Sequence, residues 1–387
     1  MNTRALCLVL AAMSMAGCAN FSGLDTQGQR LDANTLQTGK SLSGVTLSSA
    51  AWPRTDWWKS LGDPQLDSLI AEALQNSPDM QVASVRAHQA EAAAYAANAA
   101  RMPTLDASAG VSRSRLARDQ DPLGQGDAYS TVRNIGASFN YNFDLWGGQR
   151  AAWEAALGQA RAAEVDQQAA RLTLAADVAK AYSDLGQAHI VRDLAIDDLK
   201  RTRTMLDLSR RRLNSGIDSQ YQYQQTESLE ASSQSQLIDA EKQLQSAKIA
   251  LAVLLGKGPD RGNELARPSV LKPNAVAVPS VLPAELLGRR PDLIAARWRV
   301  EAASKNIAAG KASFYPNLNL SASAGAESLL GDAMFGSASR FFNIAPTISL
   351  PIFDGGRLRA NLDARDADYD LAVAQYNKTL VQALGDI

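Results

Sequence analysis

An internal repeat is the feature of this sequence that most constrains its fold. Three short segments recur in the same order in the second half of the chain: residues 78–80 as 291–293, residues 103–105 as 316–318, and residues 145–148 as 353–356. The first two pairs are 213 residues apart and the third is 208 apart, so the register changes only where a loop can absorb the difference. Ordered matches of this kind indicate a tandem duplication, and one supersecondary unit is therefore predicted twice.

Each copy is predicted to begin with a helix and to continue with two strands. Pro78 stands at the first helical position after Ser77 as the cap, and Pro103 ends the helix. Residues 134–145 alternate apolar and polar side chains over twelve positions, which is the period of a strand. The remaining predicted segments are a helix over 291–314, strands over 105–112, 318–325 and 344–352, and hairpin loops over 119–127 and 327–336.

A long helical hairpin is predicted after the strands of the first copy. Residues 147–213 contain no proline, and at 1.5 Å per residue such a helix is about 100 Å long. Leu199, Leu206 and Leu213 step by seven residues, which is typical of coiled-coil packing. Residues 214–216 break the helix, and a second helix is expected from about Asp218 to Leu255, which makes the pair antiparallel.

The N-terminus carries a secretion signal. The positively charged start is followed by an apolar run from Ala5 to Ala16, which is too short to span a bilayer. Residues 15–18 (Met-Ala-Gly-Cys) resemble a bacterial lipobox, which predicts cleavage before Cys18 and acylation of that cysteine. The residue after it is Ala rather than Asp, which by resemblance to sorted lipoproteins favours the outer membrane. The alternative is an ordinary signal peptide with a chance cysteine.

The composition argues against several functional classes. With 39 Lys and Arg against 40 Asp and Glu, the net charge of -1 disfavours a nucleic-acid-binding surface. Two Cys and two distant His predict no metal site, and no nucleotide-binding or hydrolase motif is present. The chain is rich in Ala and only 6% aromatic, which is typical of long, closely packed helices. We therefore predict a protein that is not an enzyme and has no cofactor.

The predicted strands indicate a membrane barrel. Strands of ten to twelve residues with one apolar face fit a transmembrane β-barrel. Four strands cannot close a barrel alone, and an open sheet edge is not tolerated in lipid. Three copies would supply twelve strands, while the polar helices must project into water. The predicted fold class is mainly α with a membrane β part, in which a trimeric twelve-strand β-barrel is continued by a long coiled-coil α-barrel.

Three motifs resemble a known family. They are Leu-Leu-Gly-Arg-Arg-Pro-Asp-Leu at 286–293, Ala-Ser-Phe-Tyr-Pro-Asn-Leu at 312–318 and Leu-Pro-Ile-Phe-Asp-Gly-Gly-Arg at 350–357. The chain resembles the TolC-like outer-membrane factors, in the lipoprotein (OprM and NodT) branch that serves tripartite efflux pumps. The resemblance implies a homotrimeric passive duct that exports drugs or other toxic small molecules. It also implies contact with a periplasmic adaptor protein and an inner-membrane RND-type pump.

The repeat sets the predicted domain boundaries and exposes one departure from the family. Ile387 corresponds to Ala179, about half-way along the first long helix, so a second helical hairpin of the family is missing. We expect the sequence to be a piece of a longer protein and to lack on the order of 80 of its residues. No gate residue is assigned. The predicted segments are 1–17 (signal peptide), 18–76 (N-terminal connecting segment), 77–256 (first repeat), 257–290 (equatorial connecting segment) and 291–387 (second repeat, shortened in its long helix).

Four sets of candidate residues follow. Cys18 is the predicted lipid attachment site. The hairpin tip at Arg212, Asn214, Ser215, Gly216 and Asp218 resembles the adaptor-contacting tip of the family, although a plain turn with Asp218 as the next helix cap explains the same residues. Asn140, Asn142 and Asp144 are predicted to face the barrel lumen, unless they only complete a polar strand face. Trp146, Phe341 and Phe342 are candidates for an aromatic girdle at the lipid interface, with core packing as the alternative.

Two other functions remain open at this level. One is an outer-membrane duct for type I protein secretion. The other is a lipid-anchored periplasmic coiled-coil scaffold without a pore. A scaffold does not need strands of membrane length in both repeats, which favours the duct. The exported substrate is not predicted, because the pump usually selects it.

Overall fold

The computed structural model describes residues 21, 23–32, 47–48, 56–115, 129–269, 278–279, 290–328 and 334–386. The chain divides into two compact units. The first unit contains residues 1–32, 88–162 and 293–387, and the second contains residues 33–87 and 163–292. The signal peptide, Cys18 and the predicted loop at 119–127 lie outside the described residues.

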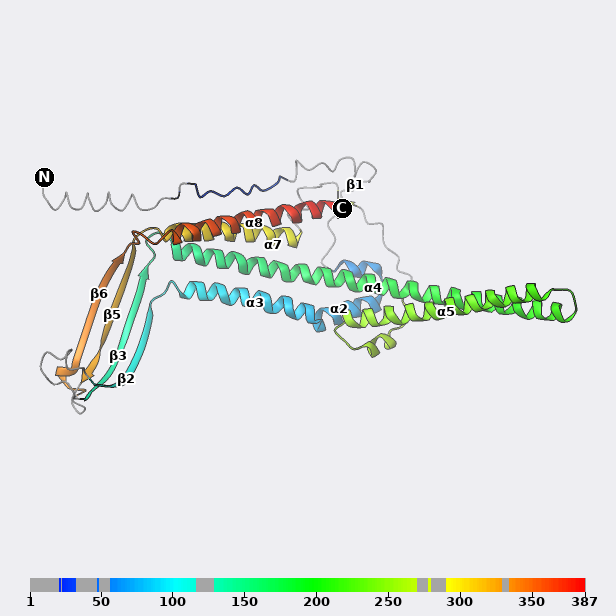
Figure 1. Ribbon diagram of the computed structural model, residues 1–387, viewed down its shortest axis with the longest axis horizontal. Helices are drawn as coiled ribbons and strands as arrows, with labels where there is room; N and C mark the ends of the chain where they lie inside the picture. The colour runs from blue at the N-terminus through cyan, green and yellow to red at the C-terminus, as the bar shows by residue number, and fades with distance from the viewer. Residues whose placement is uncertain are drawn as a thin grey trace. The chain divides into compact units, whose positions relative to one another are not determined.

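The first unit contains a four-stranded antiparallel sheet (Figure 1). Its strands are β2 (Thr104–Arg115), β3 (Tyr129–Phe143), β5 (Asn317–Ser328) and β6 (Arg340–Ser349), in the order β2-β3-β5-β6. β3 begins five residues before the predicted strand and ends two residues before its predicted end. Among the described residues β2 and β6 each pair with one strand only, so they are the two edges of the sheet.

Small side chains allow close packing of the helices in the first unit. α7 (Pro291–Ala312) and α8 (Arg357–Gly385) share a core of Val300, Ala303, Ala372 and Val373. α4 (Gly148–Asn214) approaches α7 at Gly158, where an added Cβ would lie 3.1 Å from the Ala302 Cβ. The Ala-rich composition predicted such packing. α3 (Pro78–Ala99), which belongs to this unit from residue 88 onward, precedes β2 in sequence.

The second unit has the larger apolar core. It contains η2 (Trp57–Leu61), α2 (Pro64–Asn76), the C-terminal part of α4, α5 (Gln220–Leu254) and η4 (Pro259–Glu264). Fully buried side chains of α2 pack with those of α4 and with the end of α5, and Trp58 joins them. The core includes Leu66, Leu69 and Ile70 from α2, Val178, Tyr182 and Leu185 from α4, and Leu251 and Leu255 from the end of α5. A short parallel pair, β1 (Leu47–Ser48) and β4 (Val278–Pro279), belongs to the same unit.

The sequence analysis missed α2, because residues 18–76 were taken together as a connecting segment. The signals for this helix are nevertheless local. Asp63 accepts hydrogen bonds from the backbone N–H groups of Gln65 and Leu66, and Pro64 occupies the first turn. Ser77, expected to cap α3, directly precedes that helix and its carbonyl accepts the N–H of Gln81; it is also the C-terminal cap residue of α2 and donates its own N–H to the carbonyl of Ala73.

Two searches of the described residues gave negative results. No helix in these segments has both the length and the apolar composition needed to cross a membrane. No group of three or more His, Cys, Asp or Glu side chains in the same segments is arranged to hold a metal ion.

Candidate functional site

The sheet has one apolar face. Alternate residues of β3 lie on this face, and their cross-strand partners in the neighbouring strands are also apolar over most of the sheet. The face is exposed within the chain: Leu105, Ile344 and Ile348 are about 70% exposed and Phe342 is 83% exposed. Cross-strand rows on the face include Leu105–Phe139–Ala322–Ile344 and Ala107–Ala137–Ala324–Phe342. An exposed apolar face of this length needs an apolar environment or a partner to cover it.

The opposite face is polar and carries two of the three predicted lumen residues. Asn140 lies opposite Ser321, and Asn142 lies opposite Asn319. The side-chain Oδ1 atoms of Asn142 and Asn319 are shielded and have no hydrogen-bond partner among the described groups. Unpaired acceptors of this kind are costly unless water or a solute reaches them. The Asn and Ser side chains that alternate along the strands make this face suited to line an aqueous space.

The prediction that Asp144 belongs to the strand was wrong. β3 ends at Phe143, and the Asp144 carboxylate accepts hydrogen bonds from the backbone N–H groups of Gln149 (3.0 Å) and Arg150 (2.8 Å). The first N–H groups of a helix have no partner within it, so a carboxylate at this position stabilises the start of α4. Asp354 does the same for α8 through the N–H groups of Gly356 and Leu358.

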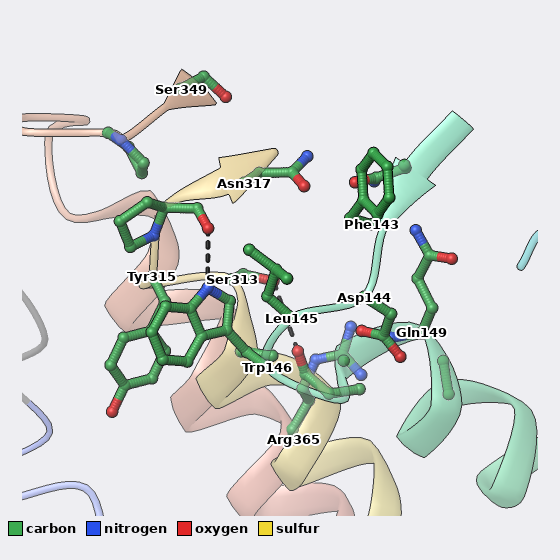
Figure 2. Close-up of a pocket in the computed structure, with 17 residues that line it drawn as sticks. Phe143, Asp144, Leu145, Trp146, Gln149, Ser313, Tyr315, Asn317, Ser349 and Arg365 are labelled. Carbon is green, nitrogen blue, oxygen red and sulfur yellow. Dashed lines mark hydrogen bonds between the residues drawn. The ribbon is translucent and has the colours of Figure 1, made fainter. Parts of the chain in front are cut away.

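Aromatic side chains gather where the strands and the helices meet (Figure 2). The Trp146 ring stacks on Tyr315 with 4.8 Å between centroids, and Trp146 Nε1 donates a 2.8 Å hydrogen bond to the Pro316 carbonyl. These residues line a cavity of about 490 Å³ at this junction. Of the other predicted girdle residues, Phe342 lies on the apolar face of the sheet, whereas Phe341 lies opposite Gly325 on the polar face.

An N-terminal arm packs against the same unit, and the sequence analysis had no signal for it. Phe21 meets Phe314 edge to face at 4.9 Å. Further along, the N–H groups of Gln27 and Gly28 donate to the Asp370 carboxylate at 2.7–3.1 Å. An added Cβ on Gly28 would lie 2.9 Å from an Asp370 oxygen, so Gly permits this close approach.

The helical hairpin tip is a well-formed turn. Gly216 adopts a φ of 72°, its N–H donates to Leu213, and the Ile217 N–H donates to Arg212, which together form a Schellman motif. Asn214, Ser215 and Gly216 are exposed, and so is the apolar side chain of Ile217, which the sequence analysis did not single out.

Asp218 does not cap α5, which was the alternative interpretation of this turn. The cap of α5 is Ser219, which forms a reciprocal capping box with Gln222. Asp218 instead accepts hydrogen bonds from Arg212 Nε (2.9 Å) and Ser209 Oγ (3.4 Å). Because these contacts cross the turn, they hold the ends of the two helices together.

Polar contacts also align the two helices behind the tip. Arg203 of α4 donates to Glu230 (3.0 Å) and Gln234 (2.7 Å) of α5, and Ser233 Oγ donates to Asp198 (2.7 Å). The pKa of Asp198 is lowered, first by the Arg201 hydrogen bond and then by that from Ser233. Side-chain hydrogen bonds therefore hold the two helices of the hairpin together behind its tip.

The fold and this two-faced sheet define an outer-membrane channel protein, and the comparisons agree. The sequence pattern of the outer membrane efflux protein family matches residues 69–257 and 282–387. The chain is 37% identical over 373 residues to the fusaric acid resistance protein FusA of Burkholderia cepacia, with 94% of this chain and 69% of that protein covered. It is 31% identical over 396 residues to the multidrug resistance outer membrane protein MdtP of Escherichia coli, covering 99% of this chain and 80% of MdtP.

The fold is shared with a solved structure. The outer membrane protein VceC of Vibrio cholerae superposes with a TM-score of 0.79 at 35% identity, over 87% of this chain and 80% of VceC. The chain belongs to the outer membrane efflux protein family. The matched relatives are named as resistance or outer-membrane proteins, which agrees with the predicted non-enzymatic role.

Proposed function

We propose that this protein is a subunit of a passive export duct in the outer membrane of a tripartite efflux system. The observation that carries the proposal is the two-faced sheet. Its apolar face suits lipid, and its polar face carries Asn and Ser side chains, which suit water. Family membership supports the same role. The duct makes no covalent change to its substrate, and partner proteins supply the energy.

The duct is a homotrimer in this proposal. Four strands leave two unpaired edges, and lipid does not tolerate such edges. Three copies provide twelve strands, an even number within the usual range for closed barrels. The α4 and α5 helices, which carry many charged side chains, extend the duct as a coiled-coil tube in the periplasm. The tandem duplication supports this arrangement, because each chain then contributes two similar pairs of strands, one from each repeat.

The hairpin tip is the proposed contact with the periplasmic adaptor protein. Exposed Asn214, Ser215 and Ile217 offer polar and apolar contacts on a rigid turn. The adaptor would in turn connect the duct to an inner-membrane RND-type pump. Multidrug resistance in the name of MdtP and fusaric acid resistance in the name of FusA favour toxic small molecules as cargo.

The N-terminal arm supports the proposed lipid anchor. Phe21, three residues after Cys18, lies beside Phe314, close in sequence to the start of β5. Acyl chains on Cys18 would therefore enter the periplasmic leaflet of the outer membrane near the aromatic residues of the strand–helix junction. Each buried CH₂ of such chains contributes about 0.8 kcal/mol.

Conductance in planar lipid bilayers tests the duct against both alternatives. The protein purified from outer membranes should be trimeric by native mass spectrometry and should open discrete channels. A stable trimer with no conductance would favour the scaffold. Deletion strains separate the two duct functions: loss of the gene should sensitise cells to small toxic compounds, whereas loss of a secreted protein without sensitisation would favour type I secretion.

A further inference from the structure

A half-buried histidine of the second unit lies among cationic side chains. We infer that His189 of α4 is an acid-sensitive latch, and that uptake of a proton by its ring releases residues 265–269 from α4. These residues directly follow η4 and belong to no helix or strand. The inference does not depend on the proposed duct, because all of these residues belong to the second unit.

The ring nitrogens of His189 have no partners. Nδ1 and Nε2 are both shielded from solvent, and neither has a hydrogen-bond partner among the described residues. A neutral imidazole has one N–H donor and one acceptor, whereas the protonated ring has two donors and a positive charge. A proton taken up in place would therefore leave a charged ring with two unpaired donors, which is costly in a shielded position.

The charges around the ring also oppose its protonation. Four charged side chains act on it electrostatically: Arg192 and Asp193 of α4, Lys248 of α5 and Arg267 of the segment after η4. Three of them are cations and one is a carboxylate. Burial lowers the pKa of His189 below its usual 6.5, the three cations lower it further, and Asp193 opposes them. The ring is therefore neutral at pH 7 while the segment is held.

An ion pair and an apolar contact hold the 265–269 segment on α4. Arg267 Nη1 donates a hydrogen bond to Asp193 Oδ2. Pro268 lies so close to Gly186 that an added Cβ on this glycine would be 3.4 Å from the Pro268 Cβ. Other hydrogen bonds join the same segment to α2 and to its cap residue. The segment therefore has attachments to α2 that do not involve the ion pair with α4.

Protonation of His189 acts directly on this ion pair. Asp193 lies four residues after His189 on the same helix, and side chains at this spacing are neighbours on the helix surface. A positively charged ring attracts Asp193 and repels Arg267, so it weakens the pair between them. The helix α4 is regular here, whereas the 265–269 segment has no hydrogen-bonded ladder of its own. The segment is therefore the element that moves.

Acid favours the released segment. At pH values above 6.5 the ring is neutral whether the segment is held or released, so the segment is fully held. At lower pH the released state binds the proton more readily than the held state, and the balance moves toward release. If the ring has its usual pKa of 6.5 in the released state and stays neutral in the held state, the released fraction rises by up to about tenfold from pH 7.5 to pH 5.5.

Thiol modification at position 268 measures the release. The reporter variant Pro268→Cys is made in the whole protein, and its reaction with a pyridyl disulfide is normalised at each pH to the reaction of a small thiol. The protein without this substitution gives the background rate. The normalised rate should rise at least about threefold from pH 7.5 to pH 5.5. Added to the reporter, His189→Gln should keep the rate slow at both pH values, because glutamine takes up no proton.

Matched variants separate the latch from a general effect of acid. His88 is the other histidine of the chain, and its side chain is exposed, so His88→Gln in the reporter should keep the full response. Arg267→Gln removes the ion pair with Asp193 and should give a fast rate at both pH values. NMR of the protein with neither histidine replaced adds an independent reading, because the His189 signal, assigned with the His88→Gln variant, should titrate with a midpoint below 6.5.

Three results would overturn the latch. They are a reporter rate that does not change with pH, an acid response that persists in full in His189→Gln, and a His189 midpoint at or above 6.5. Each of these leaves channel conductance untouched, so the proposed duct would stand. Loss of conductance with an intact acid response would overturn the duct and leave the latch.

Discussion

Tyr182 Oη donates a 2.8 Å hydrogen bond to Asp63 Oδ2, which joins the middle of α4 to the residue that caps α2. Ser269 Oγ donates a second bond of 2.6 Å to the same oxygen. Tyr182 is 1% exposed and Asp63 is 5% exposed, so neither group can turn to bulk water if the other is lost. The pKa of Tyr182 is raised, first by burial and then by Asp63, so the hydroxyl remains a donor at neutral pH.

Removing the Tyr182 hydroxyl should destabilise the second unit. Tyr182→Phe leaves the ring in the core but removes one donor from a buried carboxylate, at a cost of about 1–3 kcal/mol. Denaturant unfolding followed by tryptophan fluorescence measures the change, because Trp58 lies in the same core. The matched control is Tyr95→Phe, at a position that is 67% exposed, and its effect should stay within about 0.5 kcal/mol. Equal effects of the two variants would contradict this account.

The Asp63 carboxylate should make the free energy of unfolding depend on pH. Burial raises the pKa of Asp63, but hydrogen bonds from Ser269, Tyr182, Leu66 and Gln65 outweigh it, so the pKa lies below the usual 3.8. A carboxyl group whose pKa is lower in the folded state than in the unfolded state stabilises the fold at pH values above its unfolded pKa. This stability is lost as the pH falls through the folded pKa. The difference in unfolding free energy between the wild type and Asp63→Asn should therefore shrink below about pH 4. A difference that stays constant from pH 7 to pH 3 would rule out this role.

Gly256 should not tolerate a side chain. Its φ is 69°, and an added Cβ would lie 2.4 Å from the Asn76 carbonyl oxygen, next to the turn between α2 and α3. The left-handed conformation alone costs an L-residue about 1–2 kcal/mol, and the contact adds to it. Gly256→Ala should therefore lower the unfolding midpoint clearly. The neighbouring Gly258 has a negative φ and open space around it, so Gly258→Ala should be nearly neutral in the same unfolding assay.

Charge reversal at the hairpin tip should weaken adaptor binding without unfolding the chain. Arg212→Glu breaks the pair with Asp218 and places two negative charges beside the exposed turn. Arg212 is about half-exposed, so the stability change should be under about 1 kcal/mol. Surface plasmon resonance with the purified adaptor should show at least about a tenfold loss of affinity. Arg297→Glu, at an exposed pair far along the sequence, serves as the control; the same loss there would indicate a general charge effect.

Negative charge on the polar face of the sheet should change ion selectivity. Asn142 and Asn319 lie opposite each other, so Asn142→Asp with Asn319→Asp would add up to six negative charges to a trimeric duct. Charged rings attract counter-ions in a channel, and the cation-to-anion permeability ratio should rise by at least about twofold. Reversal potentials in asymmetric salt measure this ratio. The neutral variant Asn142→Gln should leave it unchanged, and no shift in the acidic variant would exclude these residues from the conduction path.

Local signals predicted most of the secondary structure. The long helix was expected over 147–213 and is found over Gly148–Asn214, because glycines mark both ends and no proline interrupts it. The alternation in β3 also predicted the two faces of the sheet, including the position of Asn140 and Asn142 on the polar face. The helix α2 was missed although its apolar residues Leu66, Leu69, Ile70 and Ala73 have helical spacing, so this omission was one of interpretation.

No sequence pattern could predict the roles of Asp144 and Asp218. A carboxylate can face water, pair with a cation or cap a helix, and the choice depends on which donors the chain folding brings within about 3 Å. Asp144 meets the first N–H groups of α4, and Asp218 meets Arg212 while Ser219 takes the cap. These alternatives lie within one or two residues of each other, so only the backbone geometry separates them.

The sequence by itself determined the extent of the long helix, the two faces of the strands and the order of the repeated parts, since these depend mainly on residues near one another in the chain. The tertiary structure alone decided that β3 pairs with β5, the register of each pair of strands, which polar groups stay unpaired and how the N-terminal arm packs on α8. β3 and β5 are separated by more than 170 residues of sequence. Their pairing energy exists only when both strands are in place, because each cross-strand contact needs the partner side chain opposite it.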